Sequence, residues 1–393
     1  MPRSFARRGL LAAVAAAGCH GAPAPVPVPS CGNQACAWAV LSATVDSAVR
    51  AAAAPGAVVA VSLHGARFYH SAGQLGADEP VGIDQRTVYD LASLTKVVAL
   101  TTVTMMAVDE GRIGLDDPVS RYLPGWRGTG KDAVTVRHLL THSSGLPAHR
   151  PLWREATGRD SALALVLATP LDTVPGARMV YSDLGAITLT QIVESVYGRS
   201  IDRLFRERVA GPLGLRSTRF QPPGSWLARI APTERDPWRG RLVRGEVHDE
   251  NAAFLGGVSG HAGLFSDAED LLTFGEWLLA ERADTGTPGR GPRISAGVVR
   301  EFTRRQEVVP GSSRALGWDT PSENSSAGHR LSPESFGHTG FTGTSIWLDP
   351  TRSLVVVLLS NRVNPTRDNP RLGPLRGLVA DRTVEVIEGR GHP

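Results

Sequence analysis

The chain has 393 residues, enough for two ordinary domains or for one large domain with a substantial core. Its pI is basic, but three of the charges behind the formal net charge of +4 belong to Arg3, Arg7 and Arg8, so the chain without its leader would carry about +1. The remaining arginines are spread among carboxylates and no basic run with interleaved aromatic residues occurs, which argues against nucleic-acid binding.

Residues 1–18 have the pattern of a signal peptide. Arg7 and Arg8 precede an apolar run, residues 10–17, that is far below the roughly 18 apolar residues of a membrane span, and no later segment reaches that length without charges or breakers. Ala15-Ala16-Ala17-Gly18-Cys19 resembles a bacterial lipobox, in which Cys19 would be lipidated, whereas residues 7–11 also resemble a twin-arginine signal. We therefore expect an exported protein, periplasmic or at the cell surface, that meets the membrane only through a lipid anchor at Cys19.

Residues 19–38 predict a tether. The run from Ala22 to Pro29 alternates proline with small residues, which favours an extended polyproline II spacer. Cys31 and Cys36 could pair across a short loop in an oxidising compartment or remain free thiols. Both alternatives stay open, because a sequence does not show whether the two Cα atoms come within bonding range.

The beginning of the predicted folded part contains a helix and a hairpin. An alanine-rich helical pattern runs from Val40 to Ala53 and is broken at Pro55-Gly56. Two β-rich runs, Val58–Leu63 and Arg67–Ser71, flank His64-Gly65-Ala66 and predict an antiparallel hairpin.

The end of the chain repeats this pattern in the opposite order. Thr344–Leu348 and Leu354–Leu359 predict a second hairpin around a turn at residues 349–352. Apolar residues at helical spacing from Leu375 to Ile387 predict a final helix packed on the sheet.

The central part of the chain reads as helices and loops. Loops are expected at residues 284–293 and 321–328. Helical patterns cover Val97–Asp109, Ser161–Ala168, Ala186–Tyr197, Ile201–Val209 and Ala268–Ala280. We therefore predict an α/β (α+β) fold in which residues 39–110 and 250–393 form an antiparallel sheet flanked by helices, around a mostly helical region at residues 111–249. A site between the two is expected, because small-molecule clefts form at such boundaries.

Ser93 and Lys96 are the first candidates for chemistry. Lys96 and Lys131 are the only lysines in a chain that otherwise uses arginine for its cations. A lysine can lose its proton when buried and an arginine cannot, so the presence of Lys96 points to proton transfer near Ser93. At the start of a helix, the i, i+3 spacing would place both side chains on one face. Ser93 is therefore a candidate nucleophile.

Two further motifs follow in order: Tyr181-Ser182-Asp183 and His338-Thr339-Gly340. With Ser93-Leu94-Thr95-Lys96 they resemble the three active-site motifs of the serine β-lactamase and D-alanyl-D-alanine carboxypeptidase superfamily, in its class C branch. The resemblance extends to residues 136–147, 257–266 and 359–363, and the stretch around His261 is most similar to carboxypeptidases of the penicillin-binding protein 4B type. The family's fold agrees with the predicted one.

The resemblance implies roles for the residues of the third motif. The backbone N–H groups of Ser93 and Phe341 would form the oxyanion hole. Thr339 would offer a hydroxyl to a substrate carboxylate or carbonyl, and Gly340 would let the substrate backbone lie against the strand. His338 stands where β-lactamases commonly have a lysine.

The identity of the base is left open by the sequence. A neutral Lys96 could take the proton of Ser93, or a charged Lys96 could favour the phenolate form of Tyr181, which would then act as the base. Asp183 stands where many relatives have asparagine. An acid there would favour a charged Lys96, point to Tyr181, and weaken the case for efficient β-lactam hydrolysis.

We therefore expect an exported serine hydrolase that acts through a Ser93 acyl-enzyme, as a D-alanyl-D-alanine carboxypeptidase or related peptidase or esterase. The alternatives are a β-lactamase, or a catalytically weak penicillin- or peptidoglycan-binding protein. No cofactor and no metal are expected, because the chain has no His-Glu-x-x-His pair and no cysteine cluster outside the tail.

His142 and His261 lie in glycine-bounded loops, where we expect their side chains to form hydrogen bonds with the loop backbone. The expected partner is a small-molecule or peptidoglycan-peptide substrate, and the expected state is a monomer.

Overall fold

The computed structural model describes residues 38–285, 291–323 and 325–389. The predicted signal peptide, Cys19, the tether up to residue 37 and the pair Cys31 and Cys36 lie outside the described residues, as do residues 286–290 of one predicted loop.

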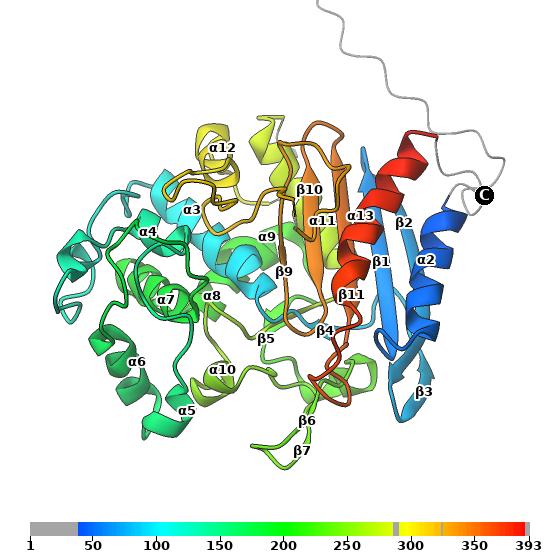
Figure 1. Ribbon diagram of the computed structural model, residues 1–393, viewed down its shortest axis with the longest axis horizontal. Coiled ribbons are helices and arrows are strands. Elements are labelled where there is room, and N and C mark those ends of the chain that lie inside the picture. Colours follow the sequence, from blue (N-terminus) through cyan, green and yellow to red (C-terminus); the bar gives the residue numbers. More distant parts are fainter. Residues whose placement is uncertain (1–37, 286–290, 324, 390–393) are drawn as a thin grey trace, which may run out of the picture.

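An antiparallel sheet of six strands, in the order β3-β2-β1-β11-β10-β9, forms one half of the molecule (Figure 1). Both predicted hairpins are present, with Leu63 opposite Ala66 in the first and Asp349 opposite Leu354 in the second. The two hairpins join where β1 pairs with β11, so that Val61 lies opposite Val356 at the centre of the sheet. The strands are β1 (Gly56–Leu63), β2 (Ala66–Gly76), β3 (Glu79–Gly82), β9 (Phe336–Thr339), β10 (Ser345–Asp349) and β11 (Leu354–Ser360).

Helices cover both faces of the sheet. On one face α2 (Ala39–Arg50) and α13 (Gly373–Ile387) lie side by side, and Val59 and Val61 of β1 point into their core (Figure 1). The neighbouring residues Val58 and Ala60 point to the other face, into the core that contains α11 (Ala268–Arg282). This alternation explains why the central strands are apolar throughout, because both of their faces are buried.

The first helix is shorter than its sequence pattern predicts. It ends at Arg50 rather than at Ala53, because Ala52 adopts a left-handed conformation with a φ of 57°. The N–H of Ala53 then donates to the carbonyl of Ala48 at 3.0 Å, as in a helix C-terminus of the Schellman type.

The other half of the molecule is built mainly of helices (Figure 1). The predicted helices are present as α6 (Arg159–Ala168), α7 (Asp183–Tyr197) and α8 (Ile201–Phe205), which continues as a π-helical turn, η4 (Arg206–Ala210). The remaining helices are α3 (Thr102–Asp109), α4 (Val136–Leu140), α5 (Leu152–Glu155), α9 (Gly211–Leu213), α10 (Glu250–Phe254) and α12 (Ala296–Thr303), with short 3-10 helices η2 (Val119–Arg121), η3 (Lys131–Ala133) and η5 (Gly224–Arg229).

Very short strands connect the two halves. In a second sheet β8 (Leu264–Ser266) lies between β4 (Tyr89–Asp90) and β5 (Arg219–Phe220), and a separate pair joins β6 (Arg235–Asp236) to β7 (Arg241–Leu242). One hydrophobic core runs from the sheet through the helical half. The domain boundaries drawn at residues 111 and 249 stay a prediction. In the part of the chain that is described, no helix has the length and apolar character to cross a membrane.

Candidate active site

Ser93 lies on a strained turn between the second sheet and a helix. After β4, Ala92 adopts a φ of 47°, a conformation that is unfavourable for any residue with a side chain. Its N–H donates to Oδ1 of Asp90 at 2.9 Å, which holds the turn. A π-helical turn, η1 (Lys96–Thr101), then leads into α3, and such wide turns are often found at functional sites. Ser93 Oγ lies 3.0 Å from Lys96 Nζ, within the reach that the sequence spacing predicts.

Lys96 is buried and uses all of its donors. Its Nζ contacts Ser93 Oγ at 3.0 Å, the carbonyl oxygen of His261 at 3.0 Å and Oδ1 of Asp183 at 2.7 Å. Burial alone would lower the pKa of Lys96, but the charge and hydrogen bond of Asp183, together with those of Tyr181, outweigh burial and raise this pKa above its ordinary value. The resting site therefore contains a lysine ammonium, which has no lone pair to accept the proton of Ser93.

Asp183 is the partner that keeps Lys96 charged. It is the first residue of α7, directly after Ser182, whose hydroxyl accepts the N–H of Gly185 at 3.1 Å as the N-cap. His149 Nδ1 lies 3.9 Å from the second carboxylate oxygen of Asp183. Burial alone would raise the pKa of Asp183, yet Lys96 and His149 lower it well below its usual range. The two residues form a buried ion pair at physiological pH.

Tyr181 is surrounded by charged and aromatic groups. Lys96 Nζ lies 4.9 Å from the centre of its ring, Arg314 Cζ lies 5.3 Å away, and the ring of His142 lies at 4.5 Å. The hydroxyl oxygen of Tyr181 is buried and has no hydrogen bond of ordinary geometry to any described residue. A buried hydroxyl without a partner costs free energy, so this atom is available to a group that enters the pocket.

His338 is a neutral imidazole in β9. Its Nδ1 lies 2.8 Å from the carbonyl oxygen of Thr339, so Nδ1 carries the proton. Burial, with the charge of Arg314 nearby, lowers the pKa of His338 well below its ordinary value. The opposite atom, Nε2, is buried and has no partner among the described residues. A lysine at this position would be a cation, whereas His338 offers an acceptor.

The end of β9 is fixed against the turn of the nucleophile. A Cβ atom on Gly340 would lie 2.3 Å from the carbonyl oxygen of Leu91, so only glycine permits this approach. The hydroxyls of Thr342 and Thr344 donate to the carbonyl oxygens of Asp90 and Leu91 at 2.7 and 3.0 Å. Gly340 and Thr339 also line the pocket beside Ser93. Gly340 thus lets β9 pack against the turn of the nucleophile, and it also leaves room in the pocket for a substrate.

Two backbone donors lie at the meeting point of these segments. Within residues 38–285, 291–323 and 325–389, the backbone N–H groups of Ser93 and Phe341 donate to no protein acceptor. Unbonded backbone donors are rare in folded proteins. Their presence next to a candidate nucleophile fits the oxyanion hole that the sequence predicts.

A cationic pocket opens on one side of Ser93. Its volume is about 440 Å³, and its wall carries three arginines and one carboxylate. The wall includes Arg314, Arg362, Arg376 and Asp319, with Tyr181, His338, Thr339 and Phe341. Nε and Nη1 of Arg314 and Nε of Arg376 are buried without a hydrogen-bond partner in the described part of the chain. Burial lowers the pKa of Arg376 to about 10, and the charge of Arg362 adds to this effect, so Arg376 is still a cation at neutral pH.

A second pocket of about 500 Å³ opens on the other side, and Ser93, Tyr181 and Phe341 line both pockets. Its wall includes Trp153, His149, His248, Asp249 and His261. The ring of His261 contacts Asp249 at 2.9 Å and Ser259 at 2.8 Å.

The structure therefore brings Ser93, Lys96, Tyr181, Asp183, His338, Thr339, Gly340 and Phe341 to one place. His142 accepts the backbone N–H of Ser182 at 3.1 Å, and the carbonyl of His261 holds Lys96. No group of three or more potential metal ligands occurs among the described residues.

Sequence reasoning missed the arginines and His248. Arg362 lies in a segment that carries the family resemblance, which was a usable signal, but Arg314, Arg376 and His248 belong to no motif.

Comparisons with known proteins identify the family and the fold of the chain. The family model described as Beta-lactamase matches residues 41–381. A protein of Salmonella schwarzengrund named "Putative D-alanyl-D-alanine carboxypeptidase" is 34% identical, over 79% of this chain and 78% of its own. A beta-lactamase/D-alanine carboxypeptidase structure from Pseudomonas syringae is similar with a TM-score of 0.71 and 18% identity, covering 91% of this chain and 99% of that one. A class C beta-lactamase from Rhodobacter sphaeroides gives 0.67 and 23%, covering 89% and 99%.

Proposed function

The chain belongs to the beta-lactamase family and is a serine hydrolase, and from this premise we propose that it is a D-alanyl-D-alanine carboxypeptidase that acts through a Ser93 acyl-enzyme. The name of the Salmonella relative supports the choice of substrate. Within the structure, the observation that carries the proposal is the cationic pocket beside Ser93.

A substrate with a terminal carboxylate matches this pocket. In a carboxypeptidase the residue that leaves carries a free carboxylate, close to the bond that is cleaved. Arginine binds carboxylates through charge-assisted, often bidentate hydrogen bonds, and Arg314 and Arg376 have buried donors without partners. A neutral ester would leave these cations unpaired, which costs binding free energy.

The resting geometry favours Tyr181 as the base for the acylation step. Lys96 donates to Ser93 Oγ, so the proton of the Ser93 hydroxyl must point to another acceptor. We propose that Tyr181, reacting as its phenolate, takes this proton while Ser93 Oγ bonds to the carbonyl carbon of the penultimate D-alanine. The C–N bond then breaks, and the leaving amine receives the proton from Tyr181. Water later cleaves the acyl-enzyme by the reverse proton route.

The two backbone donors would stabilise the charge that develops in this step. The carbonyl oxygen of the substrate becomes an oxyanion, and the N–H groups of Ser93 and Phe341 are placed to bind it. Lys96 and Asp183 remain an ion pair throughout and supply a fixed positive charge near the reacting atoms.

The experiment is a comparison of two peptides on the folded chain. An N-acylated peptide ending in D-Ala-D-Ala should release free D-alanine, and the same peptide with an amidated C-terminus should react at least about 10²-fold more slowly, because the carboxylate contacts are lost. Ser93→Ala is the inactive control. Equal rates for the two peptides would contradict the role of the arginines. Faster turnover of a penicillin than of the peptide would indicate a β-lactamase, and acylation without turnover would indicate a binding protein.

We further propose that the protein works outside the cytoplasm as a lipid-anchored monomer, attached through Cys19. The support is the sequence pattern of residues 1–38. A substrate in the cell wall lies in the same compartment.

A further inference from the structure

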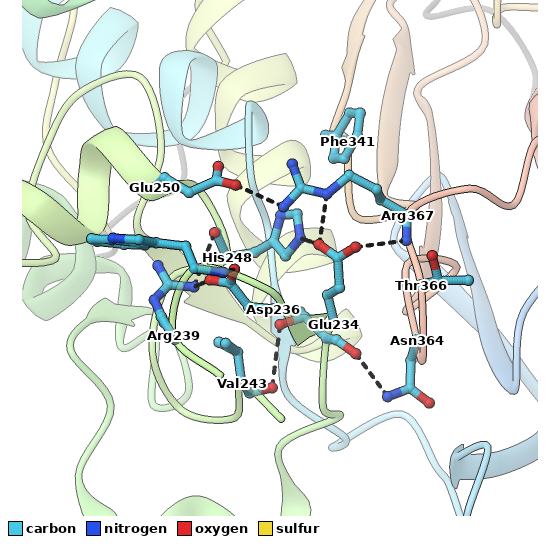
Figure 2. Close-up of polar contacts among 12 residues, drawn as sticks. Glu234, Asp236, Arg239, Val243, His248, Glu250, Phe341, Asn364, Thr366 and Arg367 are labelled. Carbon is cyan, nitrogen blue, oxygen red and sulfur yellow. Dashed lines mark hydrogen bonds and ion pairs between the residues drawn. The ribbon is translucent and has the colours of Figure 1, made fainter. Parts of the chain in front are cut away.

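Glu234 forms a buried cluster of charges behind Phe341 (Figure 2). Its Oε2 accepts from His248 Nε2 at 2.8 Å and from Arg367 Nε at 2.6 Å, and its Oε1 accepts the backbone N–H of Arg367 at 3.0 Å. Arg367 also donates to Glu250 at 2.7 Å. Burial alone would raise the pKa of Glu234, but the hydrogen bonds from His248 and Arg367 lower it to about 2. Glu234 is therefore an anion that fixes the His248 ring.

His248 is held at its backbone as well as at its ring. Its N–H donates to Oδ2 of Asp90 at 2.6 Å, and its carbonyl oxygen accepts from Arg239 at 3.3 Å. Arg239 is itself fixed by Asp236 at 2.7 Å, as Figure 2 shows. A histidine that is held by its ring, its N–H and its carbonyl has little freedom to move.

His248 contacts a neighbour of each half of the proposed oxyanion hole. Asp90, which accepts the N–H of His248, also accepts the N–H of Ala92 through its other oxygen, directly before Ser93. The His248 ring stacks on the ring of Phe341, with 5.8 Å between the centres and an angle of 19°. His248 thus contacts the segment of each of the two backbone donors.

Phe341 needs such support. It follows the end of β9, and 48% of its surface is exposed, so no hydrophobic core fixes it. Arg362 also contacts it, with Cζ 4.5 Å from the ring centre and Nε 2.8 Å from the carbonyl oxygen of Phe341. His248 and Arg362 together restrain Phe341.

We propose that His248 is a positioning residue that sets the distance between the N–H groups of Ser93 and Phe341, and that Glu234 keeps His248 in place. The proposal rests on the acyl-enzyme route proposed above. It adds the residues that align the oxyanion hole used in that route. A displaced donor weakens transition-state binding, and the loss of one oxyanion-hole donor typically costs about 10²- to 10³-fold in kcat. Misalignment through a neighbour should cost about 10- to 10²-fold.

The test separates ring stacking from general stability. His248→Gln retains an N–H group for Glu234 but loses the ring, and should lower kcat for an activated ester by about 10- to 10²-fold with little change in KM. The affinity for a boronic acid that forms a tetrahedral adduct with Ser93 should fall by the same factor. His248→Phe restores the ring but not the hydrogen bond to Glu234, so it should recover both losses only in part. His70→Gln, in a histidine–aspartate pair on β2 with 2.8 Å between His70 and Asp46, is the matched control and should change neither.

A double-mutant cycle gives an independent readout. Phe341→Leu removes the other half of the stack at an exposed position, so this variant is expected to fold. If His248 acts through Phe341, His248→Gln should cost much less in boronic acid affinity when Phe341→Leu is already present. If His248→Gln does not fold, Phe341→Leu alone must still lower kcat and boronic acid affinity together.

Two outcomes would overturn the proposal. A His248→Gln protein with a lower melting temperature but wild-type kcat and boronic acid affinity would show a purely structural role. Losses in the two single variants that add fully would show that the residues act separately. Because the ester and the boronic acid report only the chemistry of Ser93, these outcomes differ from a failure of the carboxypeptidase assignment, in which the wild type would release no D-alanine.

Discussion

Lys96 Nζ lies 2.7 Å from Asp183 Oδ1, nearer than either of the other two oxygens that it contacts. In many members of the family an asparagine takes the place of this acid. The ion pair decides the charge of the residue next to the nucleophile, and it makes the pH dependence of the enzyme a direct test of the site.

Asp183→Asn should shift the alkaline limb of the pH–rate profile to lower pH. Without the carboxylate, burial still lowers the pKa of Lys96, and only Tyr181 remains to raise it. The measurement is kcat/KM against pH with a single ester substrate. A profile that superimposes on that of the wild type would show that the charge of Lys96 does not depend on Asp183.

The same substitution should change the pH dependence of stability. The folded-state pKa of Asp183 lies below its unfolded value and that of Lys96 lies above its own. The contribution of the pair is therefore full between about pH 4 and about pH 10, the unfolded pKa values, and is lost as the pH falls through the folded pKa of Asp183 or rises through that of Lys96. The difference in melting temperature between wild type and Asp183→Asn should be largest at mildly acidic pH, shrink below pH 4, and shrink again at the alkaline pH where Lys96 of the variant loses its proton.

Tyr181→Phe should reduce kcat by about 10²- to 10⁴-fold, the usual cost of losing a general base, while the fold is retained. Lys96→Arg should also be inactive, because a guanidinium differs in shape and hydrogen-bond geometry although it keeps the charge. Near-wild-type turnover of Tyr181→Phe, with an unshifted pH profile, would make Lys96 the base instead.

Ser93 should carry the covalent label of a fluorescent penicillin or fluorophosphonate. Mass spectrometry of the digested protein should locate the label on the peptide that contains Ser93. Ser93→Ala should remain unlabelled, and a label that persists in this variant would place the nucleophile elsewhere.

Arg314→Gln should raise KM for the peptide ending in D-Ala-D-Ala by about 10- to 10²-fold, because a charge-assisted hydrogen bond contributes roughly 1.5–3 kcal/mol. The amidated peptide should be affected far less, since it has no carboxylate to lose. Arg127→Gln, at an exposed arginine outside both pockets, is the control. Equal effects of Arg314→Gln on the two peptides would mean that Arg314 does not bind the carboxylate.

Cys19→Ser should release the protein from membranes, or leave it uncleaved, whereas the wild type should fractionate with them. One acyl chain gives only marginal binding, so several chains per molecule are expected in the wild type. If both proteins are equally soluble, the chain is secreted without an anchor.

Local patterns predicted much of the fold. The two hairpins and the last helix depend on alternation, turn residues and apolar spacing, which a short window of sequence contains. The end of α2 could not be predicted, because alanine favours helices and nothing in the sequence indicates that Ala52 adopts a left-handed conformation. The second sheet was also missed, since strands of two or three residues leave no periodic signal.

The candidate site also contains residues that the sequence predicts and residues that it does not. Ser93, Lys96, Tyr181 and His338 stand in motifs with fixed spacing, so they could be named from sequence. Arg376 lies in α13 and Arg314 in a loop, and only the folded chain carries them to the same pocket. His248 gives no signal at all, because a single histidine before an aspartate is unremarkable until its ring is seen against Phe341.

The pairing of β1 with β11 also determines at which stage of translation the protein can fold. Residues that are about 300 positions apart, such as Ala57 and Ser360, must meet before the sheet closes. His338, Phe341 and Arg376 are all made after most of the chain, so Ser93 spends nearly the whole of translation without its pocket or its oxyanion hole. A nascent chain therefore has no active site, and a truncation that removes β11 should remove activity and fold together.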